Sequence, residues 1–109
     1  MKLKYKETEV LNSICEYLKV KRYFFWRNNN IAVFDAKRKC FRTFPKWCIK
    51  GVPDIFVLTP DRTVGLEVKS ATGKWGDEQK LFKQFWDSNT AKREYYVVRS
   101  VEDVRSIRL

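Results

Sequence analysis

The sequence contains no histidine among its 109 residues. This absence excludes every site built on an imidazole: the Ser-His triad, the zinc centre with histidine ligands, and the nuclease with a histidine general base. A metal ion bound to this protein must then be held by oxygen atoms. Carboxylates, carbonyls and water suit hard cations, so the expected ion is Mg²⁺, with Mn²⁺ as a substitute.

Cysteine is scarce, and its spacing is uninformative. Cys15, Cys40 and Cys48 form neither an even set nor a CxxC motif, which argues against a secreted disulfide framework and a zinc knuckle. No apolar run approaches the ~18 residues of a membrane helix, and residues 1–6 lack the apolar segment of a signal peptide. We expect an intracellular protein with no membrane partner, located in the cytoplasm of a bacterial host if it is phage-encoded.

Acidic residues are the minority among the charged ones. The 23 Lys and Arg residues outnumber the 13 Asp and Glu residues, which gives a net charge of +10. Such a balance suits a polyanion such as nucleic acid, although a well-solvated basic protein has the same composition. With 44% hydrophobic residues and no linker, residues 1–109 are expected to form a single domain.

The first periodic stretch runs from about residue 4 to residue 19. Its apolar residues at helical spacing are Val10, Leu11, Ile14, Tyr17 and Leu18. They predict a helix with one buried face. Glu7 shares the phase of that face, whereas Glu9 belongs to the polar side. Glu7 is therefore either a carboxylate that faces inward or a helix-start acid favoured by the macrodipole.

The next stretch predicts a hairpin and then a basic segment. Residues 23–27 and 31–35 have strand composition and flank three asparagines that suit a turn. In residues 36–47, basic side chains that can reach phosphates alternate with rings that can stack on bases. The alternative is a solvated loop whose rings pack on the core or on a second subunit. The predicted DNA contacts are Arg27, Asn28, Lys37, Arg38, Lys39, Arg42, Lys46 and Lys74.

Residues 51–54 (Gly-Val-Pro-Asp) and 67–69 (Glu-Val-Lys) carry the strongest signal for chemistry. Asp54 begins a buried strand over 55–58, and the next strand runs over 64–69. Strand alternation puts Glu67 and Lys69 on one face, roughly 7 Å apart. Charges in such a sheet are costly unless they are paired or bind a metal. An exposed Glu-Lys pair on an edge strand is the alternative.

The last third of the chain predicts a loop, a helix, a strand and a short helix. Asp77 is expected to cap the first helix, which should carry Leu81, Phe82, Phe85 and Trp86 inward. Gln79 is either directed towards the core, where it can bind water, a ligand or DNA, or exposed on the first turn. Residues 94–99 predict a strand, and residues 100–103 (Ser-Val-Glu-Asp) resemble a capping box.

The predicted order of helix, three-stranded meander, helix and strand resembles the PD-(D/E)XK nuclease superfamily. More narrowly, the chain resembles the VRR-NUC family, the virus-type replication-repair nucleases, in its stand-alone viral or phage form. The stretches that carry the resemblance are residues 7–10, 25–29, 50–54, 66–69, 73–79 and 98–104. The resemblance implies an α/β fold with a restriction-endonuclease-like core, in which helices flank a central mixed sheet. The implied order is α-β-β-β-α-β, with an extra hairpin in the N-terminal half and a short C-terminal helix.

The resemblance also implies a role for individual residues. Asp54 and Glu67 correspond to the metal-binding carboxylates and Lys69 to the catalytic lysine. Glu7 corresponds to the helix acid and Gln79 to the helix glutamine. Asp54, Glu67 and the Val68 carbonyl would hold one or two Mg²⁺ ions, and Glu7 would complete the site through a water or a second ion. Lys69 would orient the attacking water or stabilise the transition state.

These expectations lead to a metal-dependent, structure-selective DNA endonuclease. A homodimer presents two sites to two strands, as a Holliday junction requires, so we expect a junction resolvase whose partner is branched DNA. A flap or single-strand nuclease of the same family is the alternative within the enzyme class. Outside that class the alternatives are a DNA-binding module without catalysis and a small basic RNA-associated protein.

Overall fold

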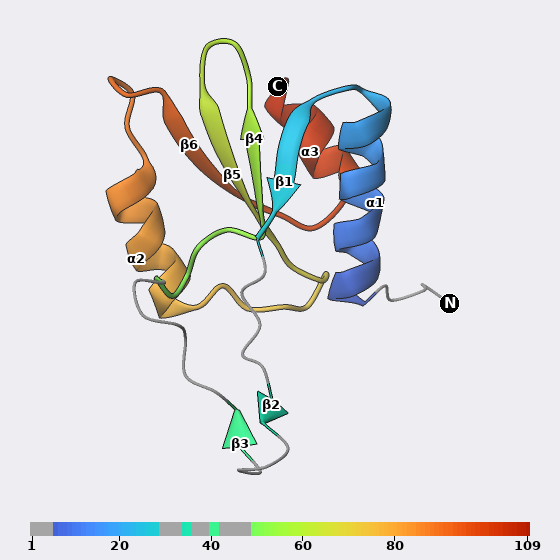
Figure 1. Cartoon of the computed structure of the whole chain (residues 1–109), viewed down its shortest axis with the longest axis vertical. Helices are drawn as coiled ribbons and strands as arrows, with labels where there is room; N and C mark the ends of the chain where they lie inside the picture. Colours follow the sequence, from blue (N-terminus) through green and yellow to red (C-terminus); the bar gives the residue numbers. More distant parts are fainter. Residues whose placement is uncertain (1–5, 29–33, 36–39, 42–48) are drawn as a thin grey trace.

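The computed structural model describes residues 6–28, 34–35, 40–41 and 49–109 (Figure 1). The elements are α1 (Glu7–Val20), β1 (Phe24–Arg27), β2 (Phe34–Asp35), β3 (Cys40–Phe41), β4 (Ile55–Leu58), β5 (Thr63–Val68), α2 (Asp77–Trp86), β6 (Arg93–Val98) and α3 (Val101–Ile107). No helix in these ranges is both long enough and apolar enough to cross a membrane.

A mixed sheet with the strand order β1-β4-β5-β6 forms the centre of the protein. β1, β4 and β5 are antiparallel neighbours, whereas β6 runs parallel to β5 after the chain has passed through α2. Figure 1 shows α1 and α3 together on one side of the sheet and α2 on the other. The predicted α/β class with a mixed sheet flanked by helices is therefore confirmed.

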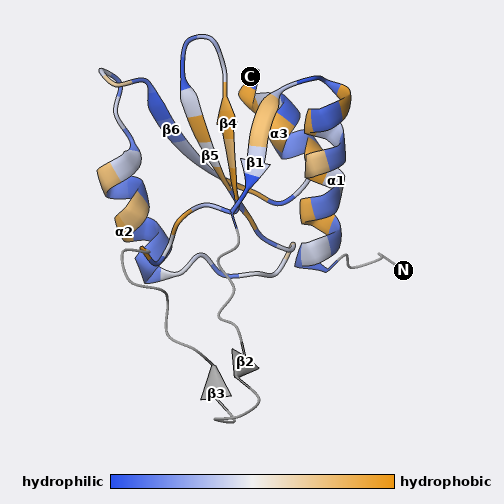
Figure 2. Ribbon diagram, viewed as in Figure 1, coloured by the Kyte–Doolittle hydropathy of each residue, from blue (hydrophilic) through white to orange (hydrophobic). Residues whose placement is uncertain are grey.

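One face of the sheet forms the apolar core with α1 and α3. Ile55, Val57, Val64, Leu66 and Val68 are all 0% exposed, because alternate residues of β4 and β5 point to this face. The helix residues buried against them are Val10, Leu11, Ile14, Leu18 and Val104. Figure 2 shows the apolar stretches of β4 and β5 at the centre of the sheet. The helical phase predicted for α1 is confirmed, and Tyr17 is half-buried at its margin.

The opposite face of the sheet packs against α2 through aromatic rings. The Phe56 ring lies 5.0 Å from that of Trp86, and the Phe82 ring lies 6.0 Å from that of Tyr95, measured between centroids. The prediction that Leu81 and Phe85 also face inward is wrong, since they are 54% and 78% exposed. Helix geometry explains the error, because these two residues form a stripe about 100° away from the one that contacts the sheet.

The predicted hairpin between residues 23–27 and 31–35 is wrong in its pairing. β1 pairs with β4, placing Trp26 opposite Phe56, whereas β2 pairs with β3 in a separate two-stranded sheet. The pairing with β4 extends past the end of β1, because the Asn28 N–H donates to the Asp54 carbonyl over 2.7 Å. The backbone pairing of β1 with β4 and the contact between the Trp26 and Phe56 rings, 5.6 Å apart, outweigh the lower loop-closure entropy cost of a local hairpin.

The predicted N-cap of α3 is correct, whereas the predicted N-cap of α2 is wrong. Ser100 is the N-cap of α3, and its hydroxyl accepts from the Asp103 N–H over 3.2 Å, which is one half of the predicted capping box. The Asp103 carboxylate accepts from the Arg99 N–H instead of the N-cap N–H. Asp77 does not cap α2, because Gly76 occupies the N-cap position and Asp77 is the first helical residue. The cap contact comes from Gln79, whose Oε1 accepts from the Gly76 N–H over 2.7 Å.

Candidate active site

The predicted carboxylates meet where β4 begins and β5 ends. The register pairs Ile55 with Leu66, so one further step places Asp54 beside Glu67. Residues that lie opposite each other in an antiparallel pair project from the same face, with Cβ atoms about 5 Å apart. The Val68 N–H donates to Oδ2 of Asp54 over 2.8 Å, which fixes the Asp54 side chain against β5. Strand alternation then places Lys69 on the same face as Glu67.

Two glycines allow the segment before Asp54 to approach its neighbours closely. Gly51 has φ +86°, and a Cβ added there would overlap the carbonyl oxygen of Glu78 at the start of α2. Gly65 lies under the same segment, where a Cβ would come within 2.7 Å of Cγ of Pro53. Both positions therefore require glycine for steric reasons, and together they fix where Asp54 stands between α2 and β5.

Glu67 is a buried carboxylate with one satisfied oxygen. It is 3% exposed, and its Oε1 accepts from Nε2 of Gln79 over 2.6 Å and lies 3.7 Å from Nζ of Lys69. Within the described ranges its Oε2 is buried without a hydrogen-bond partner. An unsatisfied buried oxygen costs free energy, more so when it is charged. Such a cost is typical of a site that awaits a ligand.

Both carboxyl groups have raised pKa values, chiefly because they are buried. Burial, followed by the charge of Asp54, raises the pKa of Glu67 to about 8, against the opposing effect of Lys69. Burial also raises the pKa of Asp54, which the Val68 N–H and the charges of Lys69 and Arg27 counteract. Two acids that resist ionising together are stabilised as a pair by an added cation.

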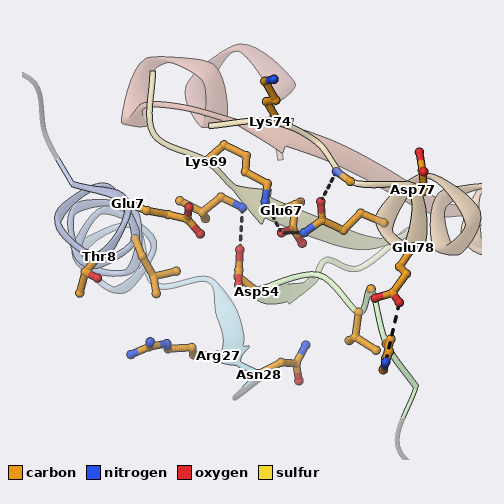
Figure 3. Close-up of a pocket in the computed structure, with 17 residues that line it drawn as sticks. Glu7, Thr8, Arg27, Asn28, Asp54, Glu67, Lys69, Lys74, Asp77 and Glu78 are labelled. Atoms are coloured by element: carbon orange, nitrogen blue, oxygen red, sulfur yellow. Dashed lines mark hydrogen bonds and ion pairs between the residues drawn. The ribbon is translucent and has the colours of Figure 1, made fainter. Parts of the chain in front are cut away.

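These groups border a pocket of about 720 Å³ between α1, the sheet and the start of α2. Figure 3 shows Glu7 directed into the pocket from α1, with Asp54, Glu67 and Lys69 facing it from the sheet. Arg27 lies at the edge formed by the end of β1. The pocket is therefore acidic at its centre and has basic groups at its margin.

The structure brings all five predicted catalytic residues to this pocket. Glu7 is exposed rather than buried, so its helical phase directs it to the pocket rather than into the core. Gln79 lies towards the sheet and contacts Glu67 directly, so it is directed towards the core rather than exposed on the first turn of the helix. Glu67 is buried, and Lys69 is only 13% exposed at its side chain, so they are not a solvated edge pair.

The predicted DNA contacts divide into three groups. Arg27 and Lys74 line the pocket, and Figure 3 shows the Lys74 amine pointing away from the carboxylates. Asn28 also lines it, but its amide donates to the Pro53 carbonyl over 2.9 Å and accepts from Nε1 of Trp26 over 3.1 Å. Asn28 therefore ties β1 to the segment that carries Asp54. The positions outside the described residues are Lys37, Arg38, Lys39, Arg42 and Lys46.

The residues of the pocket offer a small set of oxygen donors for the predicted metal ion. In the described part of the chain no group of three or more His, Cys, Asp or Glu side chains stands close enough to hold a metal. The available oxygens are those of the Asp54 and Glu67 pair and the Val68 carbonyl. The register places Pro53 opposite Val68, and since proline has no N–H it gives that carbonyl no ladder bond. A small set of oxygen ligands with room for water fits Mg²⁺.

Sequence reasoning missed several residues that shape the pocket. Lys50 and Glu78 lie 3.9 Å apart on its wall, and Thr8 lines it next to Glu7. Arg99 lies outside the pocket but bonds to the loop that forms part of its rim. Lys50 lies in the stretch 50–54 that carries the resemblance and could have been proposed from it. No local signal identifies Arg99, because its partners lie far away along the chain.

Comparisons with protein-family models, with curated proteins and with solved structures found no match to this chain.

Proposed function

We propose that the protein is a metal-dependent DNA endonuclease of the PD-(D/E)XK type that hydrolyses phosphodiester bonds. The observation that carries the proposal is the buried, unpartnered oxygen of Glu67 beside Asp54 and Lys69 at the pocket. The order of the elements supports it, because α1, β1, β4, β5, α2 and β6 follow the α-β-β-β-α-β order expected of a restriction-endonuclease-like core.

The residues of the pocket divide the chemistry among them. Asp54, Glu67 and the Val68 carbonyl would hold Mg²⁺ or Mn²⁺, and the ion would supply an activated water and neutralise charge on the phosphate. Gln79 holds Oε1 of Glu67 and so leaves Oε2 for the ion. Lys69 provides a compact cation for the water or for the transition state. Glu7, on the opposite wall of the pocket, would hold a further water.

The preferred substrate is a four-way DNA junction cut by a homodimer. The net charge of +10 suits a long polyanion, and Arg27, Lys50 and Lys74 line the pocket around its acidic centre. Two symmetric copies present two such sites to two strands, which matches the symmetry of a junction.

A flap or single-strand nuclease is the second candidate, favoured by the exposed rings on β1, whose last residue, Arg27, lines the pocket. Phe24 and Trp26 of β1 are 68% and 42% exposed, and Trp26 is bonded to Asn28 at the pocket edge. Exposed rings next to a cutting site can stack on unpaired bases.

A cleavage panel tests the proposal and separates the candidates. The substrates are a four-way junction, a flap, a duplex, single-stranded DNA and single-stranded RNA, each with Mg²⁺, Mn²⁺ or EDTA. Paired symmetrical nicks in the junction support the resolvase, and cuts in one strand near a branch support the flap nuclease. Binding to DNA without cleavage under any condition would overturn the enzyme assignment. Preference for RNA with indifference to metal would favour the RNA-associated protein.

A further inference from the structure

Residues 70–76 form the loop that joins β5 to α2 and part of the pocket rim. Several of their side chains are exposed and so contribute little packing that would fix the loop. Ala71, Thr72 and Lys74 are exposed. The loop begins with a tight turn, in which the Gly73 N–H donates to the Ser70 carbonyl over 3.1 Å. Lys74 follows that turn and lines the pocket. Whatever fixes the turn therefore also fixes the position of this rim lysine.

Arg99 is the group that holds the turn. Its Nη1 donates to the Ser70 carbonyl over 2.6 Å and to the Gly73 carbonyl over 2.8 Å, both in a partly buried setting. One planar guanidinium nitrogen thus spans both ends of the turn. Hydrogen bonds from a charged donor are about twice as strong as neutral ones. Trp75 adds a weaker restraint, because its Nε1 donates to the Tyr95 hydroxyl over 3.3 Å.

The backbone of Arg99 is itself rigidly anchored. Its N–H donates to Oδ2 of Asp103 over 2.8 Å, within the first turn of α3. The preceding residue, Val98, accepts from the Lys69 N–H over 3.0 Å and so belongs to the central sheet. The Arg99 side chain therefore links a fixed part of the fold to the loop, and we call this link, made by the bonds from Arg99 to Ser70 and Gly73, the strut.

We propose that Arg99 is a positioning residue that fixes residues 70–76 and so keeps Lys74 where it contacts a phosphate of the bound nucleic acid. The part that concerns Lys74 rests on the proposed nuclease function. The strut itself does not, since its contacts lie within the protein. Arg99 is distinct from the catalytic groups because it acts through the loop and touches none of the pocket carboxylates among its bonds.

Hydrogen exchange on the free protein tests the strut without any substrate. In Arg99→Gln, the amides of residues 70–76 should exchange at least about tenfold faster, because both charge-assisted bonds to the turn are lost. The amides of β5 and β6 should keep their protection. The matched control is Arg105→Gln, which also removes one positive charge but from a side chain of α3 that bonds to Glu102 and not to the loop among the described residues. Unchanged exchange across residues 70–76 would overturn the proposal.

Kinetics on a DNA substrate test the consequence for Lys74. Arg99→Gln should raise KM about three- to tenfold and leave kcat within about twofold, because uniform binding is lost and the chemistry is untouched. Lys74→Gln should do the same, and the double variant should be no worse than either single one. Additive effects in the double variant, or a fall in kcat alone, would contradict the link between Arg99 and Lys74.

Arg99→Lys and hydrogen exchange still test the role of Arg99 if Arg99→Gln does not fold or if the protein shows no cleavage. If Arg99→Gln fails to fold, Arg99→Lys supplies the comparison, since it keeps the charge but loses the planar guanidinium. If wild-type protein cleaves nothing, the proposed function fails, while hydrogen exchange still decides whether Arg99 holds the loop. Faster exchange limited to residues 70–76 would then support the strut alone.

Discussion

The two faces of the central sheet are built from alternate residues of the same strands, yet they differ completely in character. On the α1 and α3 side, Ile55, Leu66 and Val68 are fully buried in an apolar core. On the α2 side, their immediate neighbours Asp54 and Glu67 are acids with raised pKa values. The difference arises entirely from the two-residue period of a strand.

This contrast indicates how a chain of 109 residues combines stability with a costly site. Burial of apolar side chains on one face contributes free energy, at roughly 25 cal/mol per Å² of buried area. Part of that free energy offsets the buried carboxylate of Glu67 on the other face. Substitutions on the first face should therefore act on folding, and substitutions on the second should act on the proposed activity. Four experiments test this division.

The largest effect is expected on the acidic face. Glu67→Gln should lower cleavage by more than about 10³-fold, because it removes a ligand for the ion. The melting temperature of the metal-free protein should not fall, since the variant also removes a buried ionisable group whose charged form is costly. Asp54→Asn should behave alike, and the exposed acid Glu102, changed to Gln, serves as the control. Initial rates and thermal unfolding measure both effects; full activity in either site variant would refute the assignment.

The next largest effect is expected one residue earlier, on the apolar face. Leu66→Ala should lower the free energy of unfolding by about 2–5 kcal/mol, because it leaves a cavity in the core. Leu81→Ala on α2 removes the same atoms from an exposed side chain and should cost less than about 0.5 kcal/mol. Urea unfolding of both variants provides the measurement. Similar losses would show that the two leucines do not differ in burial.

A smaller effect is expected where the acidic face meets α2. Gly51→Ala should cost about 1–3 kcal/mol, because it strains a backbone with positive φ and pushes a methyl group against Glu78. Gly76→Ala is the control, because its nearest contact would be an ordinary 3.4 Å to Oε1 of Gln79. Thermal unfolding should rank Gly51→Ala as the more damaging change; the reverse order would contradict the close approach.

The smallest effect, counted per pH unit, is expected from the pH dependence of stability. The pKa of Glu67 lies at about 8 in the folded protein, above its ordinary value of 4.5. Between these values the folded state keeps a proton that the unfolded state has lost, so stability falls as pH rises. The slope is at most about 1.4 kcal/mol per pH unit for one group.

Unfolding of the metal-free protein between pH 5 and 8 measures this slope. Glu67→Gln should flatten it, and so should saturating Mg²⁺, which favours the ionised carboxylates. The core variant Leu66→Ala should lower the whole curve and keep the slope. A slope that survives in Glu67→Gln would assign the linked proton to another group.

Much of the candidate site was predictable because local periods determine it. The alternation of β5 places Glu67 and Lys69 on one face, and the absence of histidine restricts a metal site to oxygen ligands. The phase of α1 directs Glu7 to the pocket and the apolar residues to the core. The roles of these residues stay predictions until cleavage is measured.

Other features could not be read from local patterns. The pairing of β1 with β4 displaced the expected hairpin, and the orientation of α2 left Phe85 exposed. Gln79 had two possible environments, and only the packing of α2 on the sheet joined it to Glu67. Arg99 gave no signal, because its partners at Ser70 and Gly73 are remote in sequence.

The sequence by itself thus determined which side chains share a face, since bond geometry sets the periods of helix and strand at every position. It also determined the chemistry open to the site, through its residue types. Only the tertiary structure decided which faces meet, because strand pairing and helix packing depend on the free energy of the whole assembly. This pairing and packing brought Asp54 beside Glu67 and left one oxygen of Glu67 buried and unpaired among the described residues.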